Sequence, residues 1–238
     1  MAERDSAAAR AYQEARFPAS GTPWREVVFS SLDFETNGLD LASDEIISFA
    51  TVTVADGRVH PGDARYELVR PRRMPDHETI RIHGLREADL EQAPPLREIL
   101  DDLLEAIAGR VIVAHVAAVE RGFLGAALAE PGLELVNPIV DTAAMHRELR
   151  RLRREPPAEH DPIGLSAMVR ELGLPVHRPH HADGDALTTA QAFIALATHL
   201  EAFEPQTLGT LERISHPERR RASLGSLLGR FGLGRHRA

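Results

Sequence analysis

The stretch VVFSSLDFE, residues 27–35, is an apolar run that ends on two carboxylates, Asp33 and Glu35. Its alternation predicts a β-strand, in which side chains two positions apart lie on the same face. Asp33 and Glu35 therefore share one face, and Leu32 and Phe34 share the other. Ionised carboxylates this close repel each other and need a cation or solvent around them. The pair is typical both of a site and of a strand end that meets water.

Strand and helix patterns alternate outward from this stretch. We expect strands at 27–35, 46–57, 65–71, 111–115 and 138–142, and helices at 94–109, 117–129, 164–172 and 184–203. Turn pairs at Asn37-Gly38 and Asp56-Gly57 indicate that the first three strands form an antiparallel meander. Strands that come first as a meander and then interleave with helices predict an α/β domain with a mixed sheet covered on its faces.

Composition limits the class of protein. A chain of 238 residues with 43% hydrophobic residues can bury one sizeable core. The absence of cysteine excludes disulfides and thiolate metal sites and favours a reducing compartment. The first residues lack the apolar core of a signal peptide, and no later run is long enough to span a bilayer. We therefore expect a soluble, cytoplasmic protein.

Charge is distributed unevenly along the chain. The two ends, residues 1–25 and 201–238, carry +1 and +3 of a total of −8, so residues 26–200 hold −12. An acidic domain of this kind binds nucleic acid poorly through its own field. Either the partner is not a nucleic acid, or cations lie between the two.

Two further stretches combine acids with the ends of secondary-structure elements. In VIVAHVAAVERGFL, residues 111–124, a buried strand leads into a helix that carries Glu120. In HRPHHADGDALTTAQAF, residues 177–193, His180 precedes Asp185 by five positions, and we expect a turn at Asp183-Gly184 to start the last long helix. Acids at strand and helix ends with a nearby histidine are what a two-metal phosphodiester site requires. Oxygen ligands favour Mg²⁺ or Mn²⁺.

At these residues the sequence resembles the DEDD superfamily of 3′-to-5′ exonucleases, in the DEDDh branch that includes the proofreading epsilon subunit of bacterial DNA polymerase III. The first family motif, D-x-E-T-x-G, is matched by Asp33, Glu35, Thr36 and Gly38. The second, A-H-N-A-x-F-D-x-x-F-L, is matched by Ala114, His115, Ala117, Phe123 and Leu124. The third, H-x-A-x-x-D-A, is matched by His180, Ala182, Asp185 and Ala186. The resemblance covers roughly residues 26–200.

The second motif departs from the family pattern at three positions. Val116 replaces the usual asparagine, Val119 replaces the usual aromatic residue, and Glu120 stands where the family has aspartate. Glutamate keeps the charge but places it about one methylene further from the backbone. The alternative to an active enzyme is therefore a non-catalytic module that binds nucleic acid or a polymerase and has a degenerate site.

The resemblance implies a ribonuclease H-like α/β fold with a central five-stranded mixed sheet. It implies two divalent metal ions, Mg²⁺ or Mn²⁺, held by Asp33, Glu35, Glu120 and Asp185, and His180 as the base that activates water. It also implies substrate contacts from Phe34, Thr36 and His83. The expected activity is removal of nucleoside 5′-monophosphates from 3′ ends, with DNA favoured over RNA.

Several residues have simpler explanations beside the functional ones. His177, His180 and His181 resemble a zinc cluster, although only the spacing of His180 to Asp185 is informative. His115 is expected to bond locally, and Asp141 to cap a helix. His83 fits a turn-stabilising role as well as a substrate contact, and Phe34 fits a core role as well.

The two ends lie outside the resemblance. We expect residues 1–25 to form an N-terminal extension with a helix packed on the domain or on a second subunit, which leaves a homodimer open. Residues 26–203 are the expected exonuclease domain, and residues 204–238 form a basic tail. The tail is either solvated or a tether for single-stranded or frayed 3′ ends, or for a polymerase or another replication or repair partner.

Overall fold

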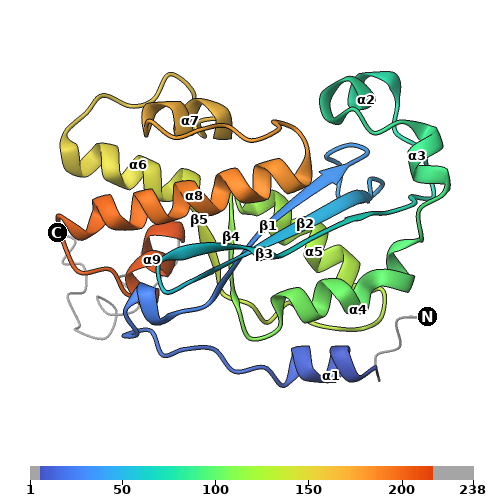
Figure 1. Cartoon of the computed structure of the whole chain (residues 1–238), viewed down its shortest axis with the longest axis horizontal. Coiled ribbons are helices and arrows are strands. Elements are labelled where there is room, and N and C mark those ends of the chain that lie inside the picture. Colours follow the sequence, from blue (N-terminus) through green and yellow to red (C-terminus); the bar gives the residue numbers. More distant parts are fainter. Residues whose placement is uncertain (1–5, 217–238) are drawn as a thin grey trace, which may run out of the picture.

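The computed structural model describes residues 6–216 as an α/β domain (Figure 1). Residues 1–5 and 217–238 lie outside the described residues, and with them lies most of the predicted basic tail. Within residues 6–216, no helix is both long and apolar enough to cross a membrane.

The chain runs as a meander of strands followed by alternating helices and strands, as the sequence predicts. The strands are β1 (Phe29–Thr36), β2 (Ile46–Ala55), β3 (Arg58–Leu68), β4 (Val111–Ala114) and β5 (Ile139–Asp141). The helices are α1 (Ala7–Gln13), the 3₁₀ helix η1 (Trp24–Glu26), α2 (His77–His83), α3 (Glu87–Glu91), α4 (Leu96–Ile107), α5 (Ala118–Ala129), α6 (Thr142–Arg153), α7 (Leu165–Glu171), α8 (Ala182–Glu201) and α9 (Leu208–Ser215).

The strands form one five-stranded mixed sheet in the order β3-β2-β1-β4-β5. β1, β2 and β3 pair antiparallel, whereas β4 runs parallel to both β1 and β5. The predicted mixed sheet and its antiparallel meander are therefore confirmed. The register of β1 against β2 shifts between Glu35 and Thr36. Such a bulge redirects the side chains that follow it and is frequent beside functional sites.

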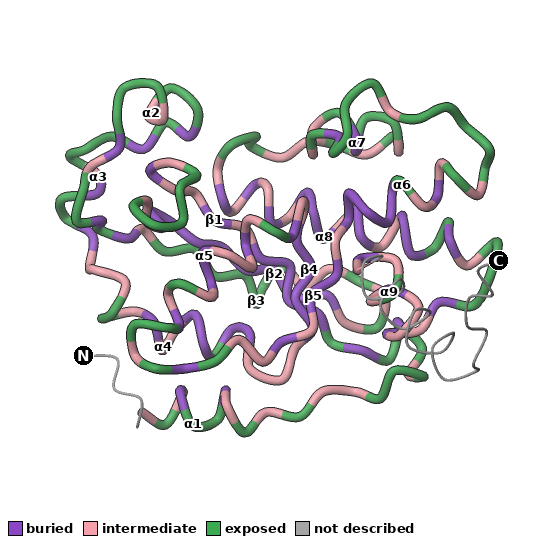
Figure 2. Tube along the Cα trace, turned by 180° about the vertical axis from the view of Figure 1, so that it is seen from behind, coloured by how far each residue is buried: buried purple, intermediate pink, exposed green. Residues whose placement is uncertain are grey.

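Helices cover both faces of the sheet (Figure 1). On one face α8 packs along β1 and β2, where the rings of Phe29 and Phe193 lie 4.5 Å apart between centroids. On the other face α4 and α5 bury Leu32, Leu104 and Leu124 completely. Each such side chain contributes about 1.5–3 kcal/mol when it leaves water. Figure 2 shows the buried residues concentrated in α8 and in the strands other than β3, whose residues are mainly exposed.

The third strand begins earlier than predicted. β3 starts at Arg58, immediately after the turn at Asp56-Gly57, rather than at residue 65. Pro61 and Gly62 obscure the strand pattern, and the sheet tolerates them because β3 is an edge strand. The predicted tight turn at Asn37-Gly38 is also wrong. Residues 37–45 form a longer loop, closed by the Asn37 side chain on the backbone of Glu45.

The start of α8 also differs from the prediction. α8 begins at Ala182, so Asp183 and Gly184 lie inside its first turn instead of forming a turn before it. α9 lies within the stretch predicted as a tail, and its Leu208 and Leu211 are buried. Packed structure therefore continues beyond residue 203, whereas the division into three segments stays a prediction.

The N-terminal helix packs on its own domain. α1 lies beside α4 (Figure 1), and Tyr12 is completely buried against it. The hydroxyl of Ser6 caps α1 and donates a 2.8 Å hydrogen bond to Asp101 of α4. The apolar face of α1 is therefore covered without a second subunit.

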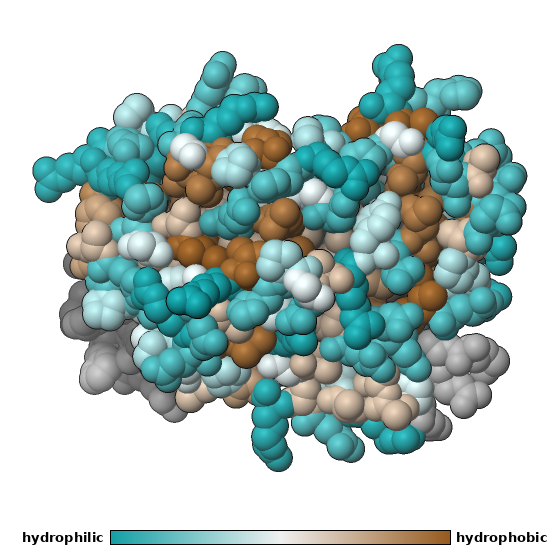
Figure 3. All heavy atoms as spheres, in the orientation of Figure 1, coloured by the Kyte–Doolittle hydropathy of each residue, from teal (hydrophilic) through white to brown (hydrophobic). Residues whose placement is uncertain are grey.

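The outer surface is mainly hydrophilic on the side seen in Figure 3, with apolar side chains in several groups. Large exposed apolar side chains include Leu39, in the loop after β1, and Ile82 of α2, which are 76% and 59% exposed. Leu39 follows the end of β1 that carries the two acids, and helix α2 lies near that end (Figure 1).

Candidate active site

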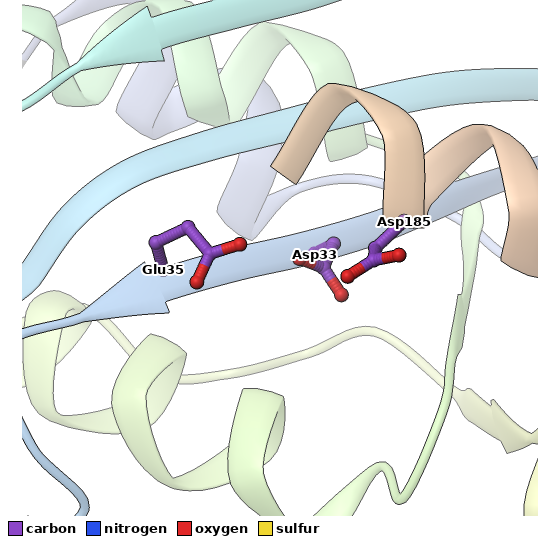
Figure 4. A group of neighbouring side chains, drawn as sticks. All are labelled: Asp33, Glu35 and Asp185. Atoms are coloured by element: carbon purple, nitrogen blue, oxygen red, sulfur yellow. The ribbon is translucent and has the colours of Figure 1, made fainter. Parts of the chain in front are cut away.

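Strand β1 carries Asp33 and Glu35 on the face that α8 covers. On the same face, the Ser31 hydroxyl donates a 2.8 Å hydrogen bond to the carbonyl of Ala186, which fixes the first turn of α8 beside β1. Figure 4 shows Asp33 and Glu35 on β1 and Asp185 on α8 with their carboxylates in one space. Elements far apart in the sequence therefore deliver these acids to one place.

The loop before α8 packs tightly enough to require glycine. A Cβ atom on Gly184 would lie 2.3 Å from the carbonyl oxygen of His177 and 2.6 Å from that of Arg178. This close approach lets the backbone N–H of His180 donate a 2.9 Å hydrogen bond to Asp185. The loop and the acid are thereby held together.

Three of the predicted acids form one group. Oxygen atoms of Asp33, Glu35 and Asp185 all lie within 4.8 Å of one another. Burial, followed by repulsion from Glu120, Glu35 and Asp185, raises the pKa of Asp33 well above its ordinary value. Burial and the charge of Asp185 raise the pKa of Glu35 to about 8, and burial raises the pKa of Asp185. Burial and mutual repulsion therefore favour the protonated forms of these acids unless a cation lies among them.

The fourth predicted acid, Glu120, lies next to Asp33 rather than inside this group. It comes from the first turn of α5 and is only 5% exposed. Burial, and then the charge of Asp141, raise the pKa of Glu120 to about 8, although its own backbone N–H opposes the shift. Its Oε2 is buried without a hydrogen-bond partner among residues 6–216.

The donor set fits a divalent cation. Carboxylate oxygens are the ligands that Mg²⁺ and Mn²⁺ prefer. A buried, unpartnered carboxylate oxygen is costly without a compensating charge, and Glu120 has such an oxygen beside Asp33. Repulsion and burial, which raise all four pKa values, are both offset when a cation binds.

Two adjacent histidines have different surroundings. His180 is exposed, has a φ of +61° and donates its backbone N–H to Asp185. Burial raises the pKa of Asp185, and this hydrogen bond and the charges of both His180 and His181 oppose the rise. A non-glycine residue with positive φ is strained, and such strain is frequent at functional sites. His181 lies beside the turn at Gly84, and its charge adds to burial in lowering the pKa of His83. Of the two histidines, only His180 has its backbone hydrogen-bonded to an acid of the site.

The predicted substrate-binding residues lie near the site in three settings. Phe34 is 8% exposed and packs in the core on the opposite face of β1. Thr36 is half-buried at the bulge that ends β1. His83 is 2% exposed, and its Nδ1 accepts a 3.0 Å hydrogen bond from the backbone of Leu85. Core packing by Phe34 and turn stabilisation by His83 are observed, and contact with a substrate stays a prediction for all three.

Two further histidines, His115 and His177, make local hydrogen bonds. His115 bonds through Nδ1 to the Thr142 hydroxyl at 3.0 Å and through Nε2 to the carbonyl of Ile163 at 2.8 Å, as local bonding predicts. His177 pairs with Gln191. Within the described part of the chain the three acids form the one potential metal-binding group, so the zinc interpretation finds no support.

Sequence reasoning identified Asp141 as the cap of α6 but missed its second role. Its carboxylate accepts from Ala143 and Ala144 at 2.8 and 3.3 Å, as a helix cap does. It also accepts from Val116 and Ala117 at 3.2 and 3.3 Å, before α5. The sequence does hold one sign of this second role. The residue before α5 is Ala117, whose side chain cannot cap the helix, so the cap has to come from elsewhere in the chain.

An α/β domain with a five-stranded mixed sheet and an acidic cluster beside its central strand is the architecture of ribonuclease H-like exonucleases. The sequence profile of the family described as Exonuclease matches residues 30–193. The chain therefore belongs to this exonuclease family, in agreement with the resemblance, and the match includes every predicted site residue.

Curated relatives carry replication names. The PolC-type DNA polymerase III of Thermotoga petrophila is 30% identical over 192 residues, which are 80% of this chain and 13% of that protein. A DNA polymerase III subunit epsilon-like protein of Rhodobacter capsulatus is 30% identical over 193 residues, or 80% of this chain and 26% of that protein. The chain thus spans only a small part of these relatives.

Solved structures share the fold. Exonuclease X in complex with 5′ overhanging duplex DNA has a TM-score of 0.60 and 23% identity, covering 79% of this chain and 99% of that one. E. coli Exonuclease I in complex with a dT13 oligonucleotide has a TM-score of 0.64 and 16% identity, covering 74% of this chain and 42% of that one.

Proposed function

We propose that this chain is a metal-dependent 3′-to-5′ exonuclease that releases nucleoside 5′-monophosphates. The observation that carries this proposal is the group of Asp33, Glu35 and Asp185, with Glu120 buried beside it, in a member of the exonuclease family. Cations in this group also explain how a domain with a net charge of −12 over residues 26–200 handles a polyanion.

We propose DNA rather than RNA as the substrate. The relatives are named as DNA polymerase III proteins, and the two structural neighbours were solved with DNA. The partners proposed are therefore single-stranded or frayed DNA 3′ ends, and a polymerase or another replication or repair protein. A homodimer remains a separate proposal, for which the packing of α1 on its own domain offers no support.

The four acids are proposed to hold two divalent ions, Mg²⁺ or Mn²⁺. Asp33, Glu35 and Asp185 would hold one ion, and Glu120 together with Asp33 would hold the other. Such ions supply Lewis acidity and offset the charge of the phosphate and of the leaving 3′ oxygen. The Ser31 hydrogen bond joins β1 to the start of α8 and would keep the acids of these two elements together.

His180 is proposed as the general base. A histidine can accept a proton at neutral pH, and this one is exposed beside Asp185. It takes the proton of a water molecule whose oxygen attacks phosphorus. The bond from phosphorus to the 3′ oxygen breaks, and that oxygen receives a proton to become the new 3′ hydroxyl.

Substrate contacts are proposed from residues around the end of β1. Thr36 is available through its half-buried side chain, and Phe34 only through its backbone, because its ring belongs to the core. His83 has an Nε2 without a hydrogen-bond partner in residues 6–216. Leu39 and Ile82, which are exposed apolar side chains, are proposed as further contacts for a nucleobase.

The alternative, a module that binds without cleaving, is favoured by the departures at Val116 and Glu120. Against it, the longer Glu120 still exerts the largest charge effect on Asp33. We therefore retain catalysis as the better account.

The test uses DNA and RNA strands of one sequence, labelled at the 5′ end, incubated with the purified protein in Mg²⁺, Mn²⁺ or excess EDTA. The expected result is a ladder that shortens from the 3′ end of DNA, disappears in EDTA and returns with metal. Undiminished cleavage in EDTA would contradict the metal site. Binding without cleavage under every condition would favour the non-catalytic module.

A further inference from the structure

The start of α5 lacks a capping residue of its own. Its N-cap position is Ala117, whose side chain cannot accept a hydrogen bond. The preceding residue, Val116, has a φ of +57°. A β-branched residue is strained in this left-handed region, so the turn into α5 does not form from its local sequence alone.

Asp141, from the end of β5, supplies what this turn lacks. Its Oδ1 accepts from the backbone N–H of Val116 at 3.2 Å, and its Oδ2 accepts from that of Ala117 at 3.3 Å. The same Oδ1 accepts from Ala143 and Ala144 at the start of α6. One carboxylate therefore joins the N-terminal ends of two helices, where backbone N–H groups are otherwise unpaired.

The backbone of Asp141 is itself held in place. Its N–H donates a 2.9 Å hydrogen bond to the hydroxyl of Ser215, at the end of α9. That hydroxyl in turn donates to the carbonyl of Leu211. Asp141 thus takes its position from β5 and α9, independently of α5.

We propose that Asp141 is a positioning residue, which holds the strained turn at Val116 and Ala117 and thereby places Glu120 beside Asp33. Glu120 lies three residues after Ala117, within the same helical turn. Its Oε2 has no hydrogen-bond partner in the described structure, so the backbone of α5 determines where the carboxylate lies. The catalytic consequence rests on the proposed function, whereas the coupling of Asp141 to Val116 does not.

Two substitutions separate positioning from helix capping. In Asp141→Ser the hydroxyl still caps α6, because serine is a good N-cap residue. The serine side chain is shorter than that of aspartate, so it does not reach the backbone N–H groups before α5. Asp141→Asn keeps the size of the side chain but replaces one carboxylate oxygen by an NH₂ group. This group is a donor and cannot accept a hydrogen bond from a backbone N–H. We expect each variant to bind Mn²⁺ about tenfold more weakly and to lower kcat about 10–100-fold, with KM for DNA unchanged.

Relief of the strain should restore function. Asparagine adopts positive φ more readily than valine, so the loss caused by Asp141→Ser should shrink to within about threefold in a Val116→Asn background. Ser6→Ala, which removes the cap of the distant helix α1, is the matched control and should leave kcat and Mn²⁺ affinity unchanged.

Wild-type Mn²⁺ affinity in both Asp141 variants would overturn the proposal. The same loss in the Val116→Asn background as in the parent would also overturn it, because the strained turn would then play no part. If the unmodified protein does not cleave DNA, the proposed function fails. Mn²⁺ affinity and the rescue by Val116→Asn still decide the role of Asp141 in that case.

Discussion

The N-terminal ends of α8 and α5 deliver acids to one site by different means. Each follows a non-glycine residue of positive φ, His180 at +61° and Val116 at +57°. At α8 the delivered acid, Asp185, itself accepts the backbone N–H of His180. At α5 the acceptor is Asp141 from β5, and Glu120 is left with an unpartnered oxygen within the described residues.

This difference separates a local arrangement from a long-range one. The conformation at the start of α8 depends on residues that are close in sequence. One of them is Gly184, where any side chain would collide with the carbonyl oxygens of His177 and Arg178. The start of α5 is complete only when β5 has joined the sheet beside β4. We therefore expect α8 to provide the more rigid part of the site and α5 the part more sensitive to substitution at a distance.

The largest expected effects come from neutralising the delivered acids. Asp185→Asn should lower the rate of DNA hydrolysis by roughly a thousandfold or more, because it removes a charge from the three-acid group. Glu120→Gln should cost about a hundredfold, because an amide is a weaker ligand beside Asp33. Steady-state kinetics with Mg²⁺ would measure both losses.

Glu148→Gln, at an exposed ion pair with Arg151, is the control for loss of one negative charge and should retain wild-type rates. A wild-type rate for Glu120→Gln would show that α5 contributes no ligand. The two helices would then not both supply acids to one metal site.

The next expected effect distinguishes the two adjacent histidines before α8. His180→Asn should reduce kcat by about 10²–10⁴-fold, since a general base is lost while asparagine still tolerates positive φ. His181→Asn should change kcat little, because His181 faces Gly84 and His83. Equal losses in the two variants would contradict the assignment of the base.

The raised pKa values of Glu35 and Glu120, both about 8, predict a pH-dependent stability. Between the ordinary value of 4.5 and about 8 the folded state keeps protons that the unfolded chain has released. The free energy of unfolding of the metal-free protein therefore falls as pH rises through this window. At the upper end, excess Mn²⁺ should raise the Tm by about 5–10 °C. Thermal melts across this range check the prediction, and a Tm that ignores both pH and Mn²⁺ would contradict it.

The smallest expected effect concerns the strain before α5. Val116→Asn should raise the free energy of unfolding by about 1 kcal/mol, because asparagine adopts positive φ at lower cost than valine. Urea unfolding would measure the change. A destabilised variant would mean that packing of the half-buried Val116 side chain outweighs the strain.

The sequence predicted those parts of the molecule that depend on short patterns. Alternation along β1 placed Asp33 and Glu35 on one face, and the five-residue spacing linked His180 to Asp185, as observed. The edge strand β3 was predicted too short, since Pro61 and Gly62 are tolerated only because no further strand pairs there.

The parts that were missed depend on contacts between distant segments. α9 carries too few apolar residues to stand out until its Leu208 and Leu211 meet the rest of the core. The second role of Asp141 requires β4 and β5 to be neighbours, and the positive φ of Val116 cannot be read from a β-branched residue. Tertiary context decides these features, so local propensity does not reveal them.

Calorimetric titration with Mn²⁺ at neutral pH shows whether the acids of β1, α5 and α8 form a divalent-metal site. Titrations in two buffers of different ionisation enthalpy report how many protons leave when the metal binds. We expect Mn²⁺ to bind with release of more than one proton, because Asp33, Glu35 and Glu120 have raised pKa values. Absence of binding, or binding without proton release, would contradict it.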